Sequence, residues 1–398
     1  MKAISKRAQQ ISPSPTLALD AKAKAMKAQG MDVISFAVGE PDFNTPDHIG
    51  QAGIDAINQH FTRYTNASGL QELKEAVCKR LKINFNQDYQ PNQIVVSNGA
   101  KHSLYNSFAA LLDDGDEVIL PTPCWVSYTE QIHLLGGVPV FVETKEENDY
   151  VMLASELKAA ITAKTKVLLL NSPNNPTGGV YSKENLQAIA DLCVENDIYV
   201  IADEIYAQLL YDGRVYTSIV NLGEEIKKRT IVINGVSKSY AMTGWRIGYT
   251  ACDAGIAKVM GSMQSHITAN PCNIAQKAAV TALNGPQESI EAMRVEFEKR
   301  RNYLVERVNA IPGLSCRKPS GAFYVFANVK GIFGKTIRGV KINTSTELCD
   351  LILNEAKVAI VPGIAFEAEG YMRFSYANSM DNIKEGLDRV EALLKEAK

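Results

Sequence analysis

The chain has 398 residues, of which 46% are hydrophobic and 22% are charged, and its net charge at neutral pH is -2. The composition is that of an ordinary globular protein, and the length suggests about two or three domains. The net charge is close to zero and no basic tract occurs, which argues against a protein that binds nucleic acids or membrane surfaces. No apolar run approaches the roughly 20 residues that span a bilayer, and the N-terminus lacks an apolar signal segment, so we expect a cytoplasmic protein.

The first part of the chain predicts short elements separated by turns. In chain order these are a helix over 17–29, a strand over 33–38, a helix over 47–60, an irregular aromatic segment over 61–69 and a helix over 70–83. The turn Gly39-Glu-Pro-Asp-Phe43 follows the strand. Because glycine has no side chain, Gly39 offers an unshielded backbone N–H in this turn.

Apolar strands then alternate with helices. The predicted strands are 93–98, 117–120, 138–142, 166–170, 198–202, 229–236 and 245–251. The predicted helices between them begin after Gly99 and cover 125–135, 155–162 and 183–195. Near-continuously apolar strands separated by helices imply a parallel sheet that is covered on both faces. We therefore predict an α/β fold for this region.

A second region begins near residue 286. It predicts a long charged helix over 287–310, strands over 321–326, 359–361 and 371–376, an exposed or mobile loop over 331–345 and a closing helix over 382–396. Short strands with peripheral helices suggest a smaller α+β domain. Residues 1–45 lie outside the regular alternation of strands and helices, so we assign them to this smaller domain. The predicted domains are 46–286, and 1–45 together with 287–398.

Polar residues collect where three predicted strands end. One strand ends in Asn171-Ser-Pro-Asn-Asn-Pro-Thr-Gly178, the next in Asp203-Glu-Ile-Tyr206 and a third in Ser237-Lys238. Ligands of parallel sheets bind outside the carboxyl ends of the strands. The strand, glycine and helix N-terminus at Gly99 can also bind an anion, although many α/β folds contain this geometry without a ligand. A lysine at such a place is costly to desolvate unless it has a covalent or ionic partner.

These motifs, with Gly244-Trp-Arg-Ile-Gly248 after Lys238 and with Arg373, resemble the fold-type I pyridoxal-phosphate aminotransferases. The resemblance is greatest to the bacterial-type (subgroup Ib) aspartate aminotransferases, and it runs from Gly39 to Arg373. It implies a mostly parallel, seven-stranded-type sheet in a large cofactor-binding domain, a small α+β domain from both termini, pyridoxal 5'-phosphate as the cofactor, and a homodimer.

The resemblance also implies roles for single residues. Lys238 forms the Schiff base with the cofactor and then carries a proton. Asp203 pairs with the pyridine nitrogen and keeps the ring protonated. Tyr206 and Asn175 donate hydrogen bonds to the phenolic oxygen of the ring. Trp125 stacks on the ring, with an ordinary core tryptophan as the alternative.

A phosphate site follows from the same resemblance. The phosphate lies at the helix that begins at Gly99 and Ala100, where Ser237 adds a hydroxyl and Arg246 a cation. Some relatives have a serine where Gly235 stands, and its contact with the phosphate is absent here. In the homodimer, Tyr64 reaches the phosphate of the neighbouring subunit, a contact that requires two chains.

The predicted substrate-binding residues are Gly39, Lys101, Trp125, Asn175 and Arg373. Arg373 clamps the α-carboxylate with its planar fork, helped by the backbone of Gly39. Lys101 holds the side-chain carboxylate of a dicarboxylic substrate. Thr16 matches a threonine of members that also use prephenate, but we favour a helix N-cap for it.

The predicted function is a ping-pong transfer of the amino group from L-aspartate to 2-oxoglutarate, which gives oxaloacetate and L-glutamate. A glutamate/aspartate-prephenate aminotransferase, or a β-lyase on the same fold, remains open. A transcriptional regulator and a nicotinamide-dependent dehydrogenase are disfavoured, because no basic patch and no G-x-G-x-x-G after a strand occurs. The seven cysteines lack metal-ligand spacing, so we expect no metal site. The expected partners are small amino acids, 2-oxo acids and a second copy of the chain.

Overall fold

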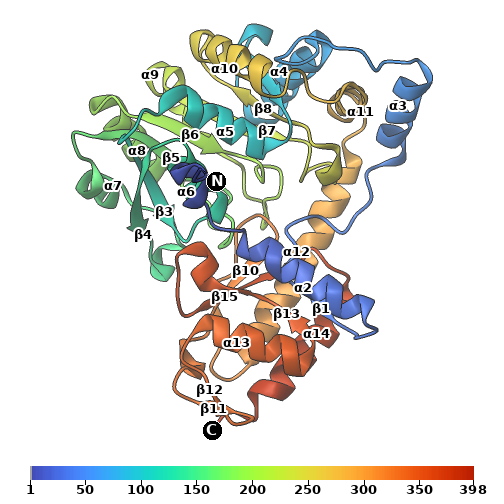
Figure 1. Ribbon diagram of the computed structural model, residues 1–398, viewed down its shortest axis with the longest axis vertical. Helices are drawn as coiled ribbons and strands as arrows, with labels where there is room; N and C mark the ends of the chain where they lie inside the picture. The colour runs from blue at the N-terminus through green and yellow to red at the C-terminus, as the bar shows by residue number, and fades with distance from the viewer. Residues whose placement is uncertain (1) are drawn as a thin grey trace.

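The structure is a computed structural model, and it describes residues 2–398. Figure 1 shows two bodies, one above the other, with the larger sheet in the upper body and the smaller sheet in the lower body. The long helix α12 (Glu288–Ala310) runs from the upper body into the lower one. No helix within the described residues has both the length and the apolar character that crossing a bilayer requires.

The large sheet has seven strands in the order β2-β8-β7-β6-β5-β3-β4. Their bounds are β2 Ile94–Ser97, β3 Glu117–Thr122, β4 Val138–Glu143, β5 Thr165–Asn171, β6 Tyr199–Asp203, β7 Thr230–Gly235 and β8 Gly248–Ala251. Strand β8 is antiparallel to both of its neighbours, whereas the pairs β3–β4, β3–β5, β5–β6 and β6–β7 are parallel. The predicted mostly parallel sheet is confirmed.

Both faces of this sheet are buried, because apolar residues follow one another along the central strands. In β5, Leu168 and Leu170 face one core while Val167 and Leu169 face the other. The first core receives side chains from α3 (Asp47–Asn58), α4 (Gln71–Phe85), α7 (Ala154–Ala160), α8 (Lys183–Glu195), α9 (Glu224–Lys228) and α11 (Asn273–Asn284). The second receives them from α5 (Ala100–Leu111), α6 (Val126–Leu134) and α10 (Ala254–Ile267). The result is the helix–sheet–helix sandwich that the strand pattern predicts.

The lower body contains a second, antiparallel sheet. Its order is β14-β15-β10-β9, with bounds β9 Ser315–Cys316, β10 Tyr324–Asn328, β14 Val361–Pro362 and β15 Tyr371–Ser375. Strand β1 (Ile34–Ser35) pairs in parallel with β13 (Val358–Ala359), so the N-terminal segment joins the C-terminal one. The helices here are α2 (Pro15–Ala28), α13 (Ser345–Leu351) and α14 (Met380–Leu394), whereas the short α1 (Lys6–Gln9) lies against α6 in the upper body. The domain boundaries near 45 and 286 stay a prediction.

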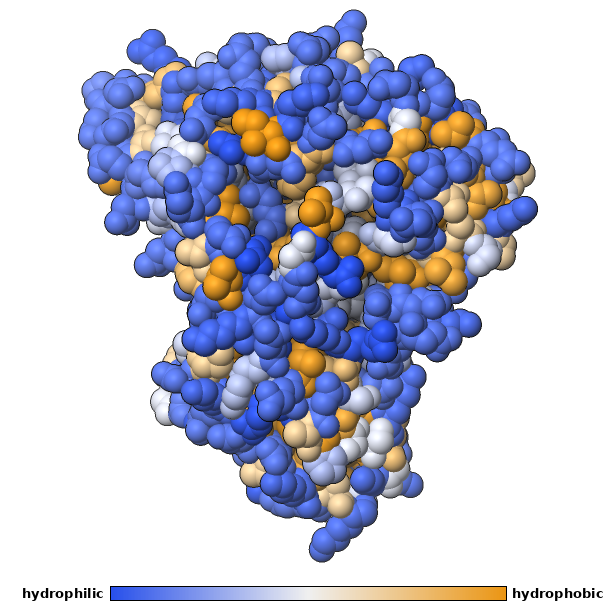
Figure 2. Space-filling view, turned by 180° about the vertical axis from the view of Figure 1, so that it is seen from behind, coloured by the Kyte–Doolittle hydropathy of each residue, from blue (hydrophilic) through white to orange (hydrophobic). Residues whose placement is uncertain are grey.

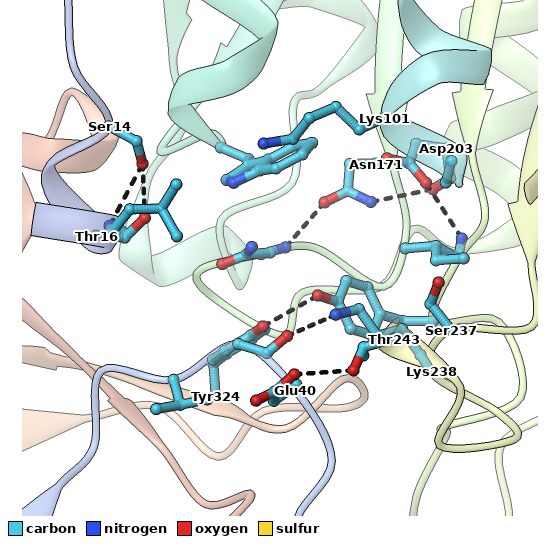
Figure 3. A pocket seen from close by; sticks show the side chains of 18 of the residues that line it. Ser14, Thr16, Glu40, Lys101, Asn171, Asp203, Ser237, Lys238, Thr243 and Tyr324 are labelled. Carbon is cyan, nitrogen blue, oxygen red and sulfur yellow. Dashed lines mark hydrogen bonds between the residues drawn. The ribbon is translucent and has the colours of Figure 1, made fainter. Parts of the chain in front are cut away.

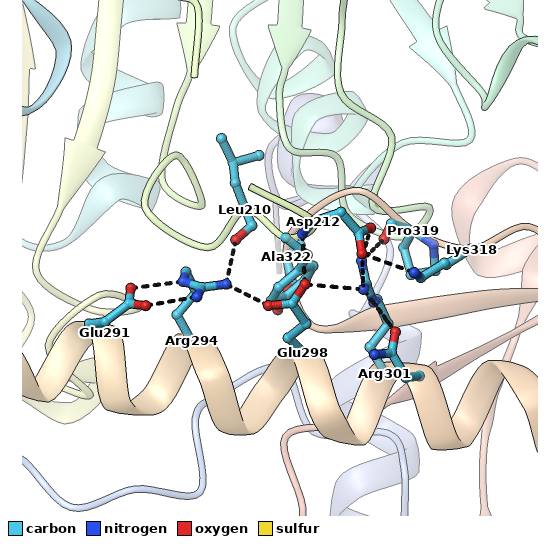
Figure 4. A network of polar contacts seen from close by, with 11 residues as sticks. Leu210, Asp212, Glu291, Arg294, Glu298, Arg301, Lys318, Pro319 and Ala322 are labelled. Carbon is cyan, nitrogen blue, oxygen red and sulfur yellow. Dashed lines mark hydrogen bonds and ion pairs between the residues drawn. The ribbon is translucent and has the colours of Figure 1, made fainter. Parts of the chain in front are cut away.

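A network of charged residues on α12 joins the two bodies, as Figure 4 shows. Arg301 is fully buried and forms two hydrogen bonds with Asp212, Nη1 to Oδ2 at 2.8 Å and Nη2 to Oδ1 at 2.9 Å. Lys318 reaches the same carboxylate at 2.9 Å, and Glu298 accepts a hydrogen bond from the Asp212 backbone N–H at 2.6 Å. The hydrogen bonds from Arg301 hold the pKa of Asp212 well below its usual range. The loop after β6 is thereby attached to the lower body.

Three local expectations need correction. The predicted strand over 33–38 shrinks to two residues, Ile34–Ser35. The segment 331–345 is exposed over much of its length, as expected, but it is not an irregular loop. It contains the hairpin β11 (Thr336–Ile337) and β12 (Val340–Lys341), and Ile332, Ile337 and Ile342 are fully buried. These three isoleucines anchor the hairpin on the core of the lower body. Helices α10 and α11 have no counterpart among the sequence predictions.

Candidate active site

A cavity of about 490 Å³ lies at the carboxyl edge of the large sheet. Strand ends, the start of α5, the start of α2 and the lower body all contribute to its lining, and Figure 3 shows the side chains that face it. The predicted site residues that line it are Gly39, Ala100, Lys101, Trp125, Asn175, Asp203, Tyr206, Ser237, Lys238, Arg246 and Arg373. Residues from widely separated motifs therefore meet in one place.

Lys238 lies just beyond β7, and its amine turns inward. Its Nζ donates a hydrogen bond to the carbonyl oxygen of Gly39 at 2.5 Å. Burial lowers the pKa of Lys238 to about 8; Arg246 lowers it further, whereas Glu40 raises it. A lysine with this pKa has a substantial fraction of neutral amine near pH 8, which is the form that acts as a nucleophile or a base. The expected role of Gly39 changes in part, because its carbonyl contacts the lysine in this structure.

Asp203 ends β6, and its side chain is 3% exposed. Its Oδ2 accepts a hydrogen bond from the hydroxyl of Tyr128 at 2.7 Å, and its Oδ1 accepts one from the backbone N–H of Ile205 at 3.2 Å. Burial raises the pKa of Asp203 to about 6, although both hydrogen bonds oppose the increase. At neutral pH this carboxyl group is therefore mostly ionised and can accept a hydrogen bond from a protonated nitrogen.

Tyr206 follows on the same segment and meets a second tyrosine from the lower body. Its hydroxyl lies 3.0 Å from the hydroxyl of Tyr324, and its ring packs edge-on against Phe323 at 5.4 Å. Burial, reinforced by Tyr324, raises the pKa of Tyr206 well above its ordinary value. Both phenols therefore keep their protons at neutral pH and remain hydrogen-bond donors.

Arg373 on β15 is a buried cation whose surroundings suit the binding of an anion. It is 2% exposed, and its guanidinium donates to Oδ1 of Asn175 at 2.9 Å and to the carbonyl oxygen of Ala37 at 2.7 Å. Neither acceptor carries a negative charge, and Nε is buried without a hydrogen-bond partner among residues 2–398. A buried cation without a counter-charge is costly, so a carboxylate ligand would stabilise this arrangement.

The turn before α5 is shaped around Arg246. Gly99 has a φ of 84°, and a Cβ atom placed on it would lie 2.1 Å from Nη2 of Arg246. Arg246 itself has a φ of 57°, and it donates to the carbonyl oxygens of Thr243 at 2.9 Å and Asn98 at 3.3 Å. Only a glycine at 99 lets the guanidinium lie against the helix start, beside backbone N–H groups that have no partner within α5.

A second glycine allows β8 to approach the same helix. A Cβ atom on Gly248 would lie 2.2 Å from the backbone nitrogen of Ala100. Gly235 is also tightly enclosed, since a Cβ atom there would lie 2.9 Å from the carbonyl oxygen of Ile247. Buried Ser237 completes this wall of the cavity. A cation, a hydroxyl and a helix N-terminus together form a cradle for a phosphate-sized anion.

Next to the start of α5, Lys101 and Trp125 lie against one another. The Nζ of Lys101, labelled in Figure 3, is 4.7 Å from the centre of the Trp125 ring. Trp125 lines the cavity and also packs against the second core, so its stacking on a ring stays a prediction. Desolvation, followed by Arg246, lowers the pKa of Lys101, although its side chain keeps access to solvent.

Thr16 is not the N-cap of its helix, contrary to the interpretation that we favoured. Ser14 is the cap of α2, and its hydroxyl accepts a hydrogen bond from the backbone N–H of Leu17 at 3.5 Å. The Thr16 hydroxyl lies 3.0 Å from that of Ser14 and borders the cavity. The helix therefore presents a threonine to the site, with its hydroxyl hydrogen-bonded to Ser14.

Tyr64 is the one predicted residue that stands apart. Its side chain is 91% exposed, and it borders a different groove, beside Asn270 and Asn273. A contact with a neighbouring subunit stays a prediction. Conversely, Tyr128 and Tyr324 belong to the site and were missed, because an ordinary tyrosine inside a helix or strand carries no sequence signal of its own.

Comparisons with known proteins agree with this geometry. A family model described as aminotransferase class I and II matches residues 31–390. An aspartate aminotransferase of Bacillus sp. (strain YM-2) is 48% identical over 392 residues, which cover 98% of this chain and 99% of the relative. A probable aspartate/prephenate aminotransferase of Aquifex aeolicus is 43% identical over 397 residues, with 99% of each chain covered. The crystal structure of the Rhizobium meliloti aspartate aminotransferase superposes with a TM-score of 0.96 at 40% identity, with 100% of each chain covered.

Proposed function

Because the chain belongs to the family of class I and II aminotransferases, we propose that it is a pyridoxal-phosphate-dependent aspartate aminotransferase. It moves the amino group of L-aspartate to 2-oxoglutarate in a ping-pong cycle and yields oxaloacetate and L-glutamate. The observation that carries the proposal is the buried amine of Lys238 in one cavity with Asp203 and with Arg373, whose guanidinium donates to uncharged oxygens within residues 2–398.

The residues of the cavity fit pyridoxal phosphate. Because Gly99 has no side chain, the guanidinium of Arg246 lies against the start of α5, and Ser237 also lines the cavity. These groups suit the phosphate. Asp203, buried and largely ionised, suits the protonated pyridine nitrogen. The amide of Asn175 and the hydroxyl of Tyr206 are polar groups available to the phenolic oxygen. When bound, the cofactor supplies an aldehyde for amine exchange and a ring that withdraws electrons from the α-carbon of the substrate.

The chain's own groups then bind the substrate and move protons. The guanidinium of Arg373 takes the α-carboxylate and orients the amino acid. The neutral amine of Lys238, whose pKa is about 8, would accept the α-proton at Nζ and pass it to the bound cofactor within the same half of the cycle, and it would move a proton in the reverse direction in the second half. Tyr206 keeps its proton because burial raises its pKa, so it acts as a donor rather than a base. The burial of Asp203, Tyr206 and Arg373 keeps bulk water away from the reacting groups.

Substrate choice depends on the outer wall of the cavity. Lys101 is a cation placed to take the second carboxylate of aspartate, in agreement with the relatives that are named aspartate aminotransferases. Prephenate is a second candidate acceptor. It is favoured by Thr16, whose hydroxyl borders the cavity instead of capping α2, and by the name of the Aquifex aeolicus relative.

The test is a set of 2-oxo acids, including oxaloacetate, 2-oxoglutarate and prephenate, offered to the purified enzyme with aspartate or glutamate, and read as kcat/KM. Aspartate with 2-oxoglutarate should lead, and prephenate should fall within about tenfold of it if Thr16 favours this acceptor. Efficient turnover of apolar amino acids, with none of aspartate, would overturn the assignment.

A variant of the lysine tests the mechanism. Lys238→Ala should lose transamination by roughly a millionfold, because the base and the covalent partner disappear together. Lys183→Ala, an exposed lysine at the start of α8, is the matched control and should keep full activity. Near-normal turnover by Lys238→Ala would refute the role of Lys238.

We extend the proposal to a cytoplasmic homodimer in which Tyr64 reaches the phosphate cradle of the partner. The seven free thiols suit a reducing compartment. The exposed Tyr64, with Ile54 and Ile57 on the neighbouring α3, supports an apolar face for a second copy. Figure 2 shows the molecule from behind, relative to Figure 1. This face is mostly hydrophilic, and its apolar residues are more numerous over the upper body. Light scattering should give twice the chain mass, and Tyr64→Phe should weaken cofactor binding without dissociating the dimer.

A further inference from the structure

Tyr128 is a buried phenol that points at the carboxylate of the proposed active site. It lies on α6 and is 1% exposed. Its hydroxyl donates to Oδ2 of Asp203 at 2.7 Å. Its ring is held edge-on against Trp125, with ring centres 5.4 Å apart and planes at 90°. The phenol therefore has a fixed direction, set by packing from one side and by the carboxylate from the other.

Few groups act on the Asp203 carboxylate. The backbone N–H of Ile205 donates to its other oxygen at 3.2 Å, and the amine of Lys238 favours its ionised form. Glu204 and Tyr206 lie on the same segment as Asp203, and a negative charge on either of them would oppose the ionisation of the Asp203 carboxyl group. Tyr128 is thus the side-chain donor that offsets the burial of this carboxylate.

We propose that Tyr128 is a positioning residue that keeps Asp203 ionised and aimed at the pyridine nitrogen of the cofactor. The inference rests on the proposed function, since the ring nitrogen belongs to the cofactor that the site is inferred to bind. Each oxygen of Asp203 already accepts one hydrogen bond, and a carboxylate oxygen has room for two. The nitrogen can therefore be bound while Tyr128 stays in place.

The strength of the phenol as a donor then sets where the shared proton lies. Without the hydroxyl, the carboxylate loses a charge-assisted hydrogen bond and its proton affinity rises. The proton moves from the ring nitrogen toward Asp203, and the ring withdraws electrons less strongly. A ring-fluorinated tyrosine has a more acidic phenol and nearly the same shape, so it shifts the proton in the opposite direction.

The experiment uses the enzyme loaded with pyridoxal phosphate that carries ¹⁵N in the ring. In Tyr128→Phe, the ¹⁵N resonance should move toward that of an unprotonated pyridine, and kcat should fall about tenfold with KM changed by less than about twofold. In the enzyme with fluorinated tyrosine at 128, the resonance should move the other way. Tyr181→Phe removes a buried hydroxyl that accepts from the backbone of Met152 in the other core, and it should match the wild type.

The outcomes separate this inference from the function on which it rests. Unchanged ¹⁵N resonances in both Tyr128 variants, beside a large change in Asp203→Asn, would overturn the role of Tyr128 and leave the proposed function intact. Failure of the wild-type protein to bind the labelled cofactor, or an unchanged resonance in Asp203→Asn, would overturn the proposed function itself. Equal shifts in the same direction for both Tyr128 variants would indicate a packing effect and would also refute the inference.

Discussion

Gly99→Ala should damage cofactor binding far more than it damages folding. Gly99 combines a φ of 84° with a ψ of 162°, a region that essentially only glycine occupies. An added Cβ atom would also lie 2.1 Å from Nη2 of Arg246, which is closer than any real contact. Backbone at the helix start is rigid, so the guanidinium has to leave its position against the turn. The alanine therefore disturbs the cation of the anion cradle directly.

The two effects have separable magnitudes. The backbone strain costs about 1–3 kcal/mol of folding free energy. Displacement of Arg246 removes a charge-assisted hydrogen bond to the phosphate, which is worth about 1.5–3 kcal/mol. At 1.4 kcal/mol for each tenfold, the dissociation constant of pyridoxal phosphate should rise roughly tenfold to a hundredfold. Gly115 gives a matched control, because its φ is 91° and no atom lies within 4 Å of a Cβ placed there.

Two measurements decide the outcome. Equilibrium titration of the apoenzyme with pyridoxal phosphate gives the dissociation constant, and urea unfolding of the apoenzyme gives the stability free of ligand linkage. Gly115→Ala should lose stability alone, whereas Gly99→Ala should lose stability and affinity. A Gly99→Ala protein that binds the cofactor as tightly as the wild type would refute the assignment of this turn as the phosphate cradle.

Three further predictions concern charged groups. The kcat for aspartate should rise with pH and level off above about 8, because kcat reports the enzyme–substrate complex, in which Lys238 is a free amine, and the pKa of this amine is about 8; a flat profile would contradict this. Arg373→Lys should lower kcat/KM roughly a hundredfold, since the fork that grips the α-carboxylate is lost; a change below about twofold would exclude that contact. Arg301→Met should cost about 1.5–3 kcal/mol in urea unfolding, because the charge-assisted hydrogen bonds from the buried guanidinium to Asp212 are lost, whereas Arg317→Met, which breaks an exposed pair, should cost less than about 1 kcal/mol; equal losses would refute the importance of burial.

Much of the large body could be predicted because its signals are local. The order of apolar strands and helices gave the mostly parallel sheet, and the motifs at Asn171, Asp203 and Lys238 pointed to the edge where the cavity lies. The smaller strands were less accessible. Strand β1 has only two residues and exists because it pairs with β13, more than three hundred residues away in the chain. The hairpin in 331–345 has a Gly- and Lys-rich sequence, and its three buried isoleucines give no pattern that distinguishes it from a loop.

The pairing of side chains across the site could not be predicted from any local pattern. Nothing near Tyr128 indicates that its hydroxyl reaches Asp203, and nothing near Ser14 indicates that it, rather than Thr16, caps α2. Each of these contacts depends on distances that only the folded chain establishes.

The sequence by itself determined which chemical groups this protein has and, through strand ends and glycines, which edge of the sheet they gather on. Tertiary structure decided their state. The amine at Lys238 has a pKa of about 8 because the fold buries it beside two arginines. The guanidinium of Arg373 donates to uncharged oxygens because β15 places it against an amide and a carbonyl group. Covalent chemistry is encoded residue by residue, but desolvation and hydrogen bonding depend on neighbours that are distant in the chain, and these set the reactivity of the site.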